Sequence, residues 1–183
     1  MSEPMSYALS VAIPAPNLRD WLSAPCPGPE RWNDWHNLQI SLESGLFELA
    51  ARQRGRQIGA ILAELVRPVP GGWHFSWTDG WLELVALEGS DNWSVHMLYL
   101  SAFRAMGYHG AGPGEAVAHG YVWREGLSDW GLEIGHFGET RLSAGLEPGA
   151  RTRLDALVLP FVASARAGET GIARNDLDFW RRR

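Results

Sequence analysis

The most constraining feature of this 183-residue sequence is a pair of apolar, aromatic-rich runs joined by an Asp-Gly step. Residues 73–77 alternate aromatic with polar side chains, and a second apolar run covers residues 81–87. Alternation with a period of two is typical of a strand that buries one face. The intervening Asp79-Gly80 step readily adopts the positive φ angles of a tight turn. The segment 73–87 is therefore predicted to be a β-hairpin, and a helix there would contradict this interpretation.

Several other segments have the pattern of regular secondary structure. Strands are predicted over residues 7–13, 36–42, 116–124 and 130–137, and helices over 44–67, 92–106 and 150–167. Gly55 and Gly59 favour a bend or break in the first helix, Gly107 is expected to end the second, and Pro160 favours a kink or a later start in the third.

These elements follow one another in strand–strand–helix order, three times over. This order favours an α+β fold: a largely antiparallel sheet of five to six strands with three helices packed on one face. It does not match the βαβ alternation that a parallel dinucleotide-binding sheet requires.

The length fits a single domain over residues 1–183. Five prolines fall between positions 14 and 29, and because proline withholds a backbone donor, residues 14–33 are predicted to form an irregular covering loop. Leu18, Trp21 and Leu22 are expected to pin this loop to the core. The tail, residues 168–183, is expected to be loosely attached.

The basic residues exclude several kinds of chemistry. All 16 are arginine, so no phosphate-binding P-loop lysine, Schiff base or kinase lysine can come from this chain. The single Cys26 cannot form an internal disulfide, and it lies between two prolines, away from a helix N-terminus that would lower its pKa. With no long apolar run for a signal peptide or a membrane span, we expect a cytoplasmic protein that does not contact membranes.

No motif declares a catalytic or metal site. Glu133, His136 and Glu139 have the spacing of a helical metal site, but the glycines among them disfavour a helix, and on a strand Glu133 and His136 would point to opposite faces. The glycine-rich 110–114 segment follows a helix rather than a strand, which favours a flexible linker over a phosphate loop. A catalytic triad assembled from distant residues stays open. We therefore expect no cofactor, no metal and no enzymatic activity.

The charge distribution argues against nucleic-acid binding. Between Pro68 and Glu147 there are ten carboxylates and three arginines, and such a segment would repel a phosphate backbone. Positive charge gathers instead in the first helix and in the last 36 residues.

The ten tryptophans are several times more than usual, and tryptophan is a strong anchor in protein interfaces. Trp81 and Trp130 lie next to carboxylates at the ends of predicted strands, so both are predicted to anchor a basic protein partner. The predicted partner-binding residues are Asp79, Trp81, Glu83, Glu125, Asp129, Trp130 and Glu133.

In its size, acidity, tryptophan content and lack of a catalytic signature, the chain resembles the immunity proteins of bacterial polymorphic toxin systems. The resemblance implies a non-enzymatic inhibitor that neutralises a cognate toxin by occluding its active site, the toxin often being a nuclease or a nucleotide-targeting enzyme. The alternative is a small enzyme or ligand-binding domain, with a pocket between the sheet and the proline-rich loop.

Overall fold

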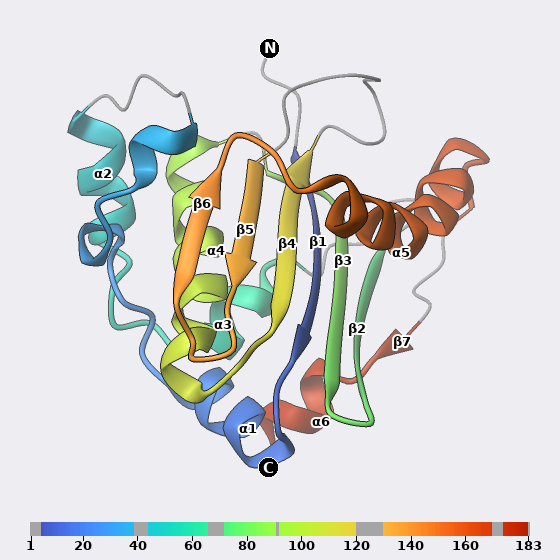
Figure 1. Ribbon diagram of the computed structural model, residues 1–183, viewed down its shortest axis with the longest axis horizontal. Coiled ribbons are helices and arrows are strands. Elements are labelled where there is room, and N and C mark those ends of the chain that lie inside the picture. Colours follow the sequence, from blue (N-terminus) through green and yellow to red (C-terminus); the bar gives the residue numbers. More distant parts are fainter. Residues whose placement is uncertain are drawn as a thin grey trace.

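A seven-stranded sheet runs through the middle of the protein in the computed structural model (Figure 1). The structure describes residues 5–38, 44–65, 72–90, 92–119, 130–169 and 174–182. Across the sheet the strands lie in the order β6-β5-β4-β1-β3-β2-β7, and every pairing is antiparallel except that of β2 with β7. The strands are β1 (Met5–Ala12), β2 (Trp73–Thr78), β3 (Trp81–Ser90), β4 (Gly114–His119), β5 (Trp130–Ile134), β6 (Thr140–Ser143) and β7 (Arg174–Asn175).

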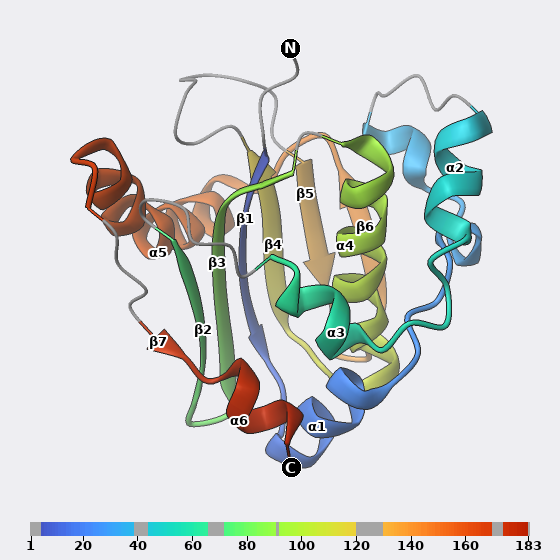
Figure 2. The ribbon, with the colours of Figure 1, turned by 180° about the vertical axis from the view of Figure 1, so that it is seen from behind.

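Helices cover both faces of the sheet (Figure 2). On one side lie α1 (Ala15–Ser23), α3 (Ile58–Ala63), α4 (Trp93–Ala105) and α6 (Leu177–Arg181), with α2 (Ser44–Ala51) packed outside α4. On the other side α5 (Pro148–Arg166) crosses β1, β3 and β4. Short 3-10 turns are η1 (Pro29–Arg31), η2 (Trp35–Leu38) and η3 (Met106–His109). The fold is thus α+β, as predicted, but its described part has more strands and helices than the sequence indicated, and α5 occupies the face expected to be bare.

The alternation of β3 shows how one strand serves two cores. Leu82 and Leu84 point into the main core between the sheet and α1, α3 and α4, where Trp21 is fully buried and its Nε1 donates to the Ala102 carbonyl at 2.9 Å. Val85 and Leu87 point to the opposite face of the sheet, into a small core beneath α5. A period of two therefore divides the strand between two layers.

The 73–87 hairpin and the helix after it are confirmed. Thr78 pairs with Trp81 across the turn, and both turn residues have positive φ, 53° at Asp79 and 88° at Gly80. The Asn92 side chain accepts a hydrogen bond from the Ser94 backbone N–H at 2.9 Å and so caps α4. The first predicted helix is broken as expected near Gly55, whose φ is 84°. The α-helix α4 ends at Ala105, two residues before Gly107, as expected, and the chain then continues through the 3-10 turn η3 to a left-handed Gly110.

Other segments differ from the predictions for identifiable reasons. The 14–33 segment contains α1 instead of an irregular loop, because a proline in the first helical turn loses no internal hydrogen bond. Residues 36–38 form η2 rather than a strand, and 39–42 fall outside the described residues. The predicted 130–137 strand ends at Ile134 and turns into β6. The tail, expected to be loosely attached, pairs with β2 through β7 and buries Leu177 and Trp180.

A buried arginine joins the proline-rich segment to the rest of the protein. The Arg104 side chain is 2% exposed, and its Nη1 lies 2.7 Å from the Asp34 carboxylate. Its guanidinium stacks over Trp32 at 4.6 Å and over Trp35 at 5.5 Å. The other Asp34 oxygen accepts the backbone N–H of Leu142 at 3.0 Å. One ion pair therefore holds α4, β6 and the 32–35 segment together.

Candidate functional site

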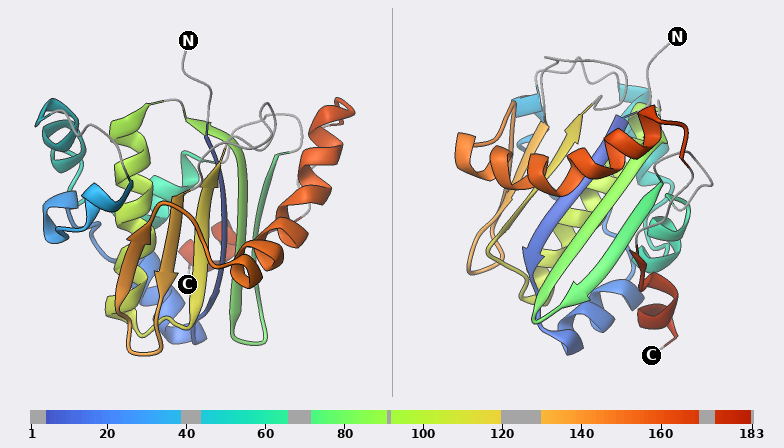
Figure 3. Two further views of the ribbon diagram at one scale, coloured as in Figure 1. Left: turned by 45° about the horizontal axis from the view of Figure 1, so that its top comes forward. Right: turned by 90° about the vertical axis from the view of Figure 1, so that its right-hand side faces the viewer.

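Half of one sheet face lies outside the cover of α5. The helix crosses the strands near the start of β1, and Figure 3 shows the strands continuing beyond it. In this half, Ser10 pairs with Glu83 on one side and Glu115 on the other, and Glu115 pairs with Glu133. Paired residues point to the same side of a sheet, so these side chains form one row. We call this surface the open sheet face; it comprises Ser10, Ala12, Thr78, Trp81, Glu83, Glu115, Glu133 and Arg141.

Trp81 is the exposed aromatic residue of this surface. Its side chain is 46% exposed, although it sits in the sheet between Ala12 and Thr78. Asp79 is exposed in the adjacent turn, and Glu83 lies two residues further along the same face of β3. The fold therefore brings together four of the predicted partner-binding residues, namely Asp79, Trp81, Glu83 and Glu133.

The carboxylates of the row differ in how far they are neutralised. The Arg153 Nε of α5 lies 2.8 Å from Glu115, and Arg141 of β6 lies 2.8 Å from Glu133. Glu83 instead faces the His74 Nε2 at 3.6 Å. Burial lowers the pKa of His74 despite the opposing effect of Glu83, so the imidazole is neutral at pH 7. At the Trp81 end, Glu83 therefore lies beside a neutral imidazole, while the nearby Arg174 donates to Thr78 at 3.2 Å and pairs with Asp176 at 2.9 Å.

Trp130 is not an exposed anchor, and this prediction is corrected. It is 5% exposed and points to the main core, where its ring centroid lies 4.5 Å from that of Trp93 and 5.7 Å from that of His96. Position 130 has the opposite side-chain direction to Glu133 on β5, because an odd separation on a strand reverses the face. Glu125 and Asp129 lie outside the described residues.

A serine, a histidine and a glutamate do meet on this face, but not as a catalytic triad. Ser76 Oγ lies 3.2 Å from the His74 Nε2, and Glu83 approaches the same nitrogen. In a triad the acid orients Nδ1 while the nucleophile uses Nε2. Here the His74 Nδ1 is buried and has no hydrogen-bond partner among the residues that the structure describes, and Ser76 is only 5% exposed. Because Ser76 and Glu83 meet the same ring nitrogen, Glu83 is not placed to hold His74 in the orientation in which it would act as a base toward Ser76.

Other chemical groups raised by the sequence are also separated. Glu133 belongs to the open sheet face, whereas a Glu139 oxygen accepts the Phe137 backbone N–H at 3.1 Å within the β5–β6 turn. The described residues contain no group of three His, Cys, Asp or Glu side chains that could hold a metal ion. Burial raises the pKa of the Cys26 thiol to about 12, so it is protonated at neutral pH and a poor nucleophile.

Some residues of the surface were not found from the sequence. Ser10 and Glu115 join the row only through strand pairing, which local spacing does not reveal. Outside the open sheet face, Phe137 is a further exposed aromatic residue: it is 92% exposed at the β5–β6 turn, beside a Gly107–Gly138 backbone contact too close to admit a Cβ atom. In the sequence, the signal for this exposed residue is an aromatic side chain close to two glycines, Gly135 and Gly138.

No protein-family model, curated protein or solved structure matches this chain. Among the described helices, none combines the length and apolar character needed to cross a bilayer.

The lowered pKa of His74 predicts a pH-dependent stability. The unfolded chain binds a proton at this histidine near pH 6.5, whereas the folded protein binds it only at lower pH. The stability that the neutral His74 contributes is therefore fully present above about pH 6.5, and it is lost as the pH falls through the lowered pKa that His74 has in the folded protein. We expect the free energy of unfolding, measured in urea from about pH 8 to pH 5, to fall less steeply in His74→Gln than in the wild type. Equal slopes in the variant and the wild type would contradict the prediction.

Proposed function

We propose that this chain is a non-enzymatic, protein-binding inhibitor of the immunity type, which neutralises a cognate toxin domain by occluding its active site. The observation that carries the proposal is Trp81, half-exposed between Asp79 and Glu83 on a sheet face that α5 leaves uncovered. A tryptophan is costly to leave in water, and such residues contribute most of the binding energy in many interfaces.

The charge of the surface selects a basic partner. On and beside the open sheet face, carboxylates outnumber arginines five to three; they are Asp79, Glu83, Glu115, Glu133 and Asp176 against Arg141, Arg153 and Arg174. A toxin domain that acts on nucleic acid or nucleotides needs cationic side chains to bind phosphate, so its active site offers the complementary charge. An acidic inhibitor in the cytoplasm would compete with the substrate for that surface.

The proposal predicts that a toxin domain is encoded beside the gene for this chain, and the experiment uses that domain. Co-expression of the wild-type chain should relieve growth arrest by that domain. In surface-based kinetics, Trp81→Ala should raise the dissociation rate at least tenfold, in keeping with about 2 kcal/mol or more for an interface aromatic. The matched control is Phe179→Ala, which removes a similarly exposed aromatic residue of α6, on the opposite side of the sheet, and should bind normally.

Charge reversal tests the electrostatic part separately. Asp79→Arg and Glu83→Arg should slow association, and the effect should shrink in high salt because exposed charges are screened. A Trp81→Ala protein that melts like the wild type and binds like it would overturn the proposal. An acidic docking surface on the toxin would do the same.

A further inference from the structure

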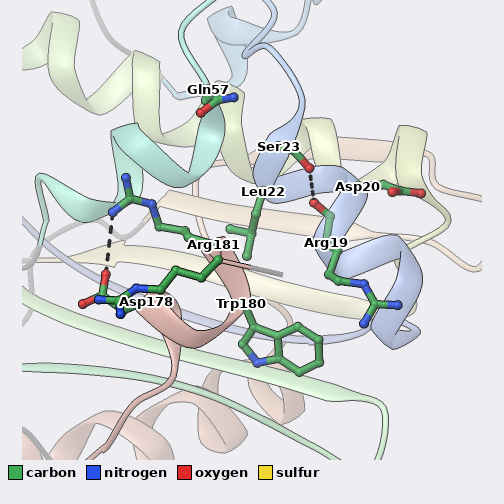
Figure 4. Close-up of a pocket in the computed structure, with 9 residues that line it drawn as sticks. Arg19, Asp20, Leu22, Ser23, Gln57, Asp178, Trp180 and Arg181 are labelled. Carbon is green, nitrogen blue, oxygen red and sulfur yellow. Dashed lines mark hydrogen bonds and ion pairs between the residues drawn. The ribbon is translucent and has the colours of Figure 1, made fainter.

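On the opposite side of the sheet α1 meets α6 (Figure 2), and residues of both helices line a hollow there (Figure 4). Its volume is about 620 Å³, within the range of small-molecule binding sites. Two segments far apart in the sequence, 19–23 and 178–182, line it together with Gln57. The fold thus builds this hollow from the tail and from the proline-rich segment.

Three arginines and two aspartates, Asp20 and Asp178, are the charged residues that line the hollow. Arg19 comes from α1, and Arg181 and Arg182 come from the end of the tail. Arg19 and Arg182 form no ion pair with any residue that the structure describes. Arg181 has only an exposed partner, Asp178, at 3.7 Å, and exposed pairs of this kind are weak.

The floor of the hollow is fixed by packing. Trp180 is buried, its ring packs edge-on against Trp77 with centroids 5.3 Å apart, and the Arg19 guanidinium lies 6.0 Å from its centroid. Gly59 leaves room for the Arg181 stem, since a Cβ there would lie 3.1 Å from the Arg181 Cγ. Figure 4 shows the Arg19 and Arg181 guanidinium groups on opposite sides of Trp180 and Leu22, with the Asp20 carboxylate directed away from Arg19.

We propose that this hollow binds a soluble, phosphorylated small molecule, whose phosphate oxygens accept hydrogen bonds from Arg19, Arg181 and Arg182. A guanidinium fork matches the spacing of phosphate oxygens, and several separate forks suit an anion with more than one charge. The site is independent of the open sheet face, because the two lie on opposite sides of the sheet and share no residue.

Inorganic pyrophosphate is the first probe. In titration calorimetry of the full chain, we expect saturable binding of pyrophosphate, tighter than that of sulfate at equal ionic strength. Arg19→Gln and Arg182→Gln should each weaken pyrophosphate binding at least tenfold, as expected for the loss of a charge-assisted hydrogen bond. Both side chains reach solvent, so thermal melts should show folded proteins.

The matched control is Arg166→Gln, which removes an exposed arginine on α5, on the other side of the sheet. It should bind pyrophosphate like the wild type. An equal loss in the control would show general charge attraction, and the absence of saturable binding in the wild type would also overturn the proposal. A third arm uses vesicles of phosphatidylcholine with phosphatidic acid: binding to these vesicles without binding to pyrophosphate would replace the soluble ligand by a lipid headgroup and overturn the proposal as stated.

Discussion

Replacing Arg104 with methionine is expected to lower the free energy of unfolding by about 3–5 kcal/mol, the usual cost of removing one partner of a buried ion pair. The substitution leaves the Asp34 carboxylate without its cation, while the bonds from the Leu142 backbone and from its own backbone remain. Methionine fills much of the volume of the arginine stem but cannot stack a charge over Trp32. Urea unfolding at neutral pH measures the change.

The Asp34–Arg104 pair also makes the stability of the protein depend on pH in the acid range. Burial alone would raise the pKa of the Asp34 carboxyl, but the hydrogen bonds from Arg104 and from the Leu142 backbone lower it below its ordinary value. The stability that Asp34 contributes is therefore present above the ordinary carboxyl range and is lost as the pH falls through the lowered folded value. In Arg104→Met the loss of stability caused by protonation of Asp34 should occur at higher pH, because the cation that lowers the pKa of Asp34 is absent.

Two comparisons make the Arg104 prediction specific. Arg54→Met breaks an exposed pair with Glu30 at 3.4 Å and should change the free energy of unfolding by less than about 1 kcal/mol. The double variant Arg104→Met with Asp34→Leu should recover part of the loss, because it removes the stranded charge as well. An Arg104→Met protein as stable as Arg54→Met would show that the buried pair does not hold the 32–35 segment in place.

The parts of the fold that were predicted correctly are those with local signals. The Asp79-Gly80 turn sets its own backbone angles and the register of its two strands, and Asn92 satisfies a donor within two residues of itself. Such features do not depend on the rest of the protein. The α+β class followed from the strand–strand–helix order of the predicted elements.

The errors arose where packing outweighs the local pattern. Residues 36–38 alternate as a strand would, yet Trp35 donates its Nε1 to the Pro29 carbonyl at 2.7 Å, which favours the compact η2 turn. The tail has few apolar residues, but Leu177 and Trp180 are enough to dock it. A two-residue strand such as β7 has no period that a sequence can display.

The open sheet face illustrates the same limit for the candidate site. Sequence spacing placed Trp81 and Glu83 on one face, since both lie on β3, but it gave no means of assigning that face to the core or to solvent. Whether that face is buried depends on the position of α5. The apolar residues Leu154, Val158 and Val162 pack α5 over Val85 and Val117, and not over Trp81. Strand order then determines which glutamates join the row.

The two tryptophans first considered equivalent should therefore respond oppositely to truncation. We expect Trp130→Ala to lower the free energy of unfolding by about 3–5 kcal/mol, the range for removing a large buried aromatic side chain. The cavity would open beside Trp93 and beside His96, whose Nδ1 bonds to the buried Tyr7 hydroxyl. Trp81→Ala should cost less than about 1.5 kcal/mol, because nearly half of its side chain already contacts water and only partial burial is lost.

Denaturant unfolding followed by far-ultraviolet circular dichroism compares the two variants without relying on tryptophan fluorescence. The slope of the free energy against urea should stay the same in both, since the size of the fold is unchanged, while the midpoint should fall sharply in Trp130→Ala only. Trp130→Phe is the matched control, and it should recover most of the loss because a ring again fills the space between Trp93 and His96. A Trp130→Ala protein with a wild-type midpoint would mean that position 130 faces solvent, which would reverse the face assignment of β5. That result would remove Glu133 from the open sheet face, because residues 130 and 133 point to opposite sides of the strand.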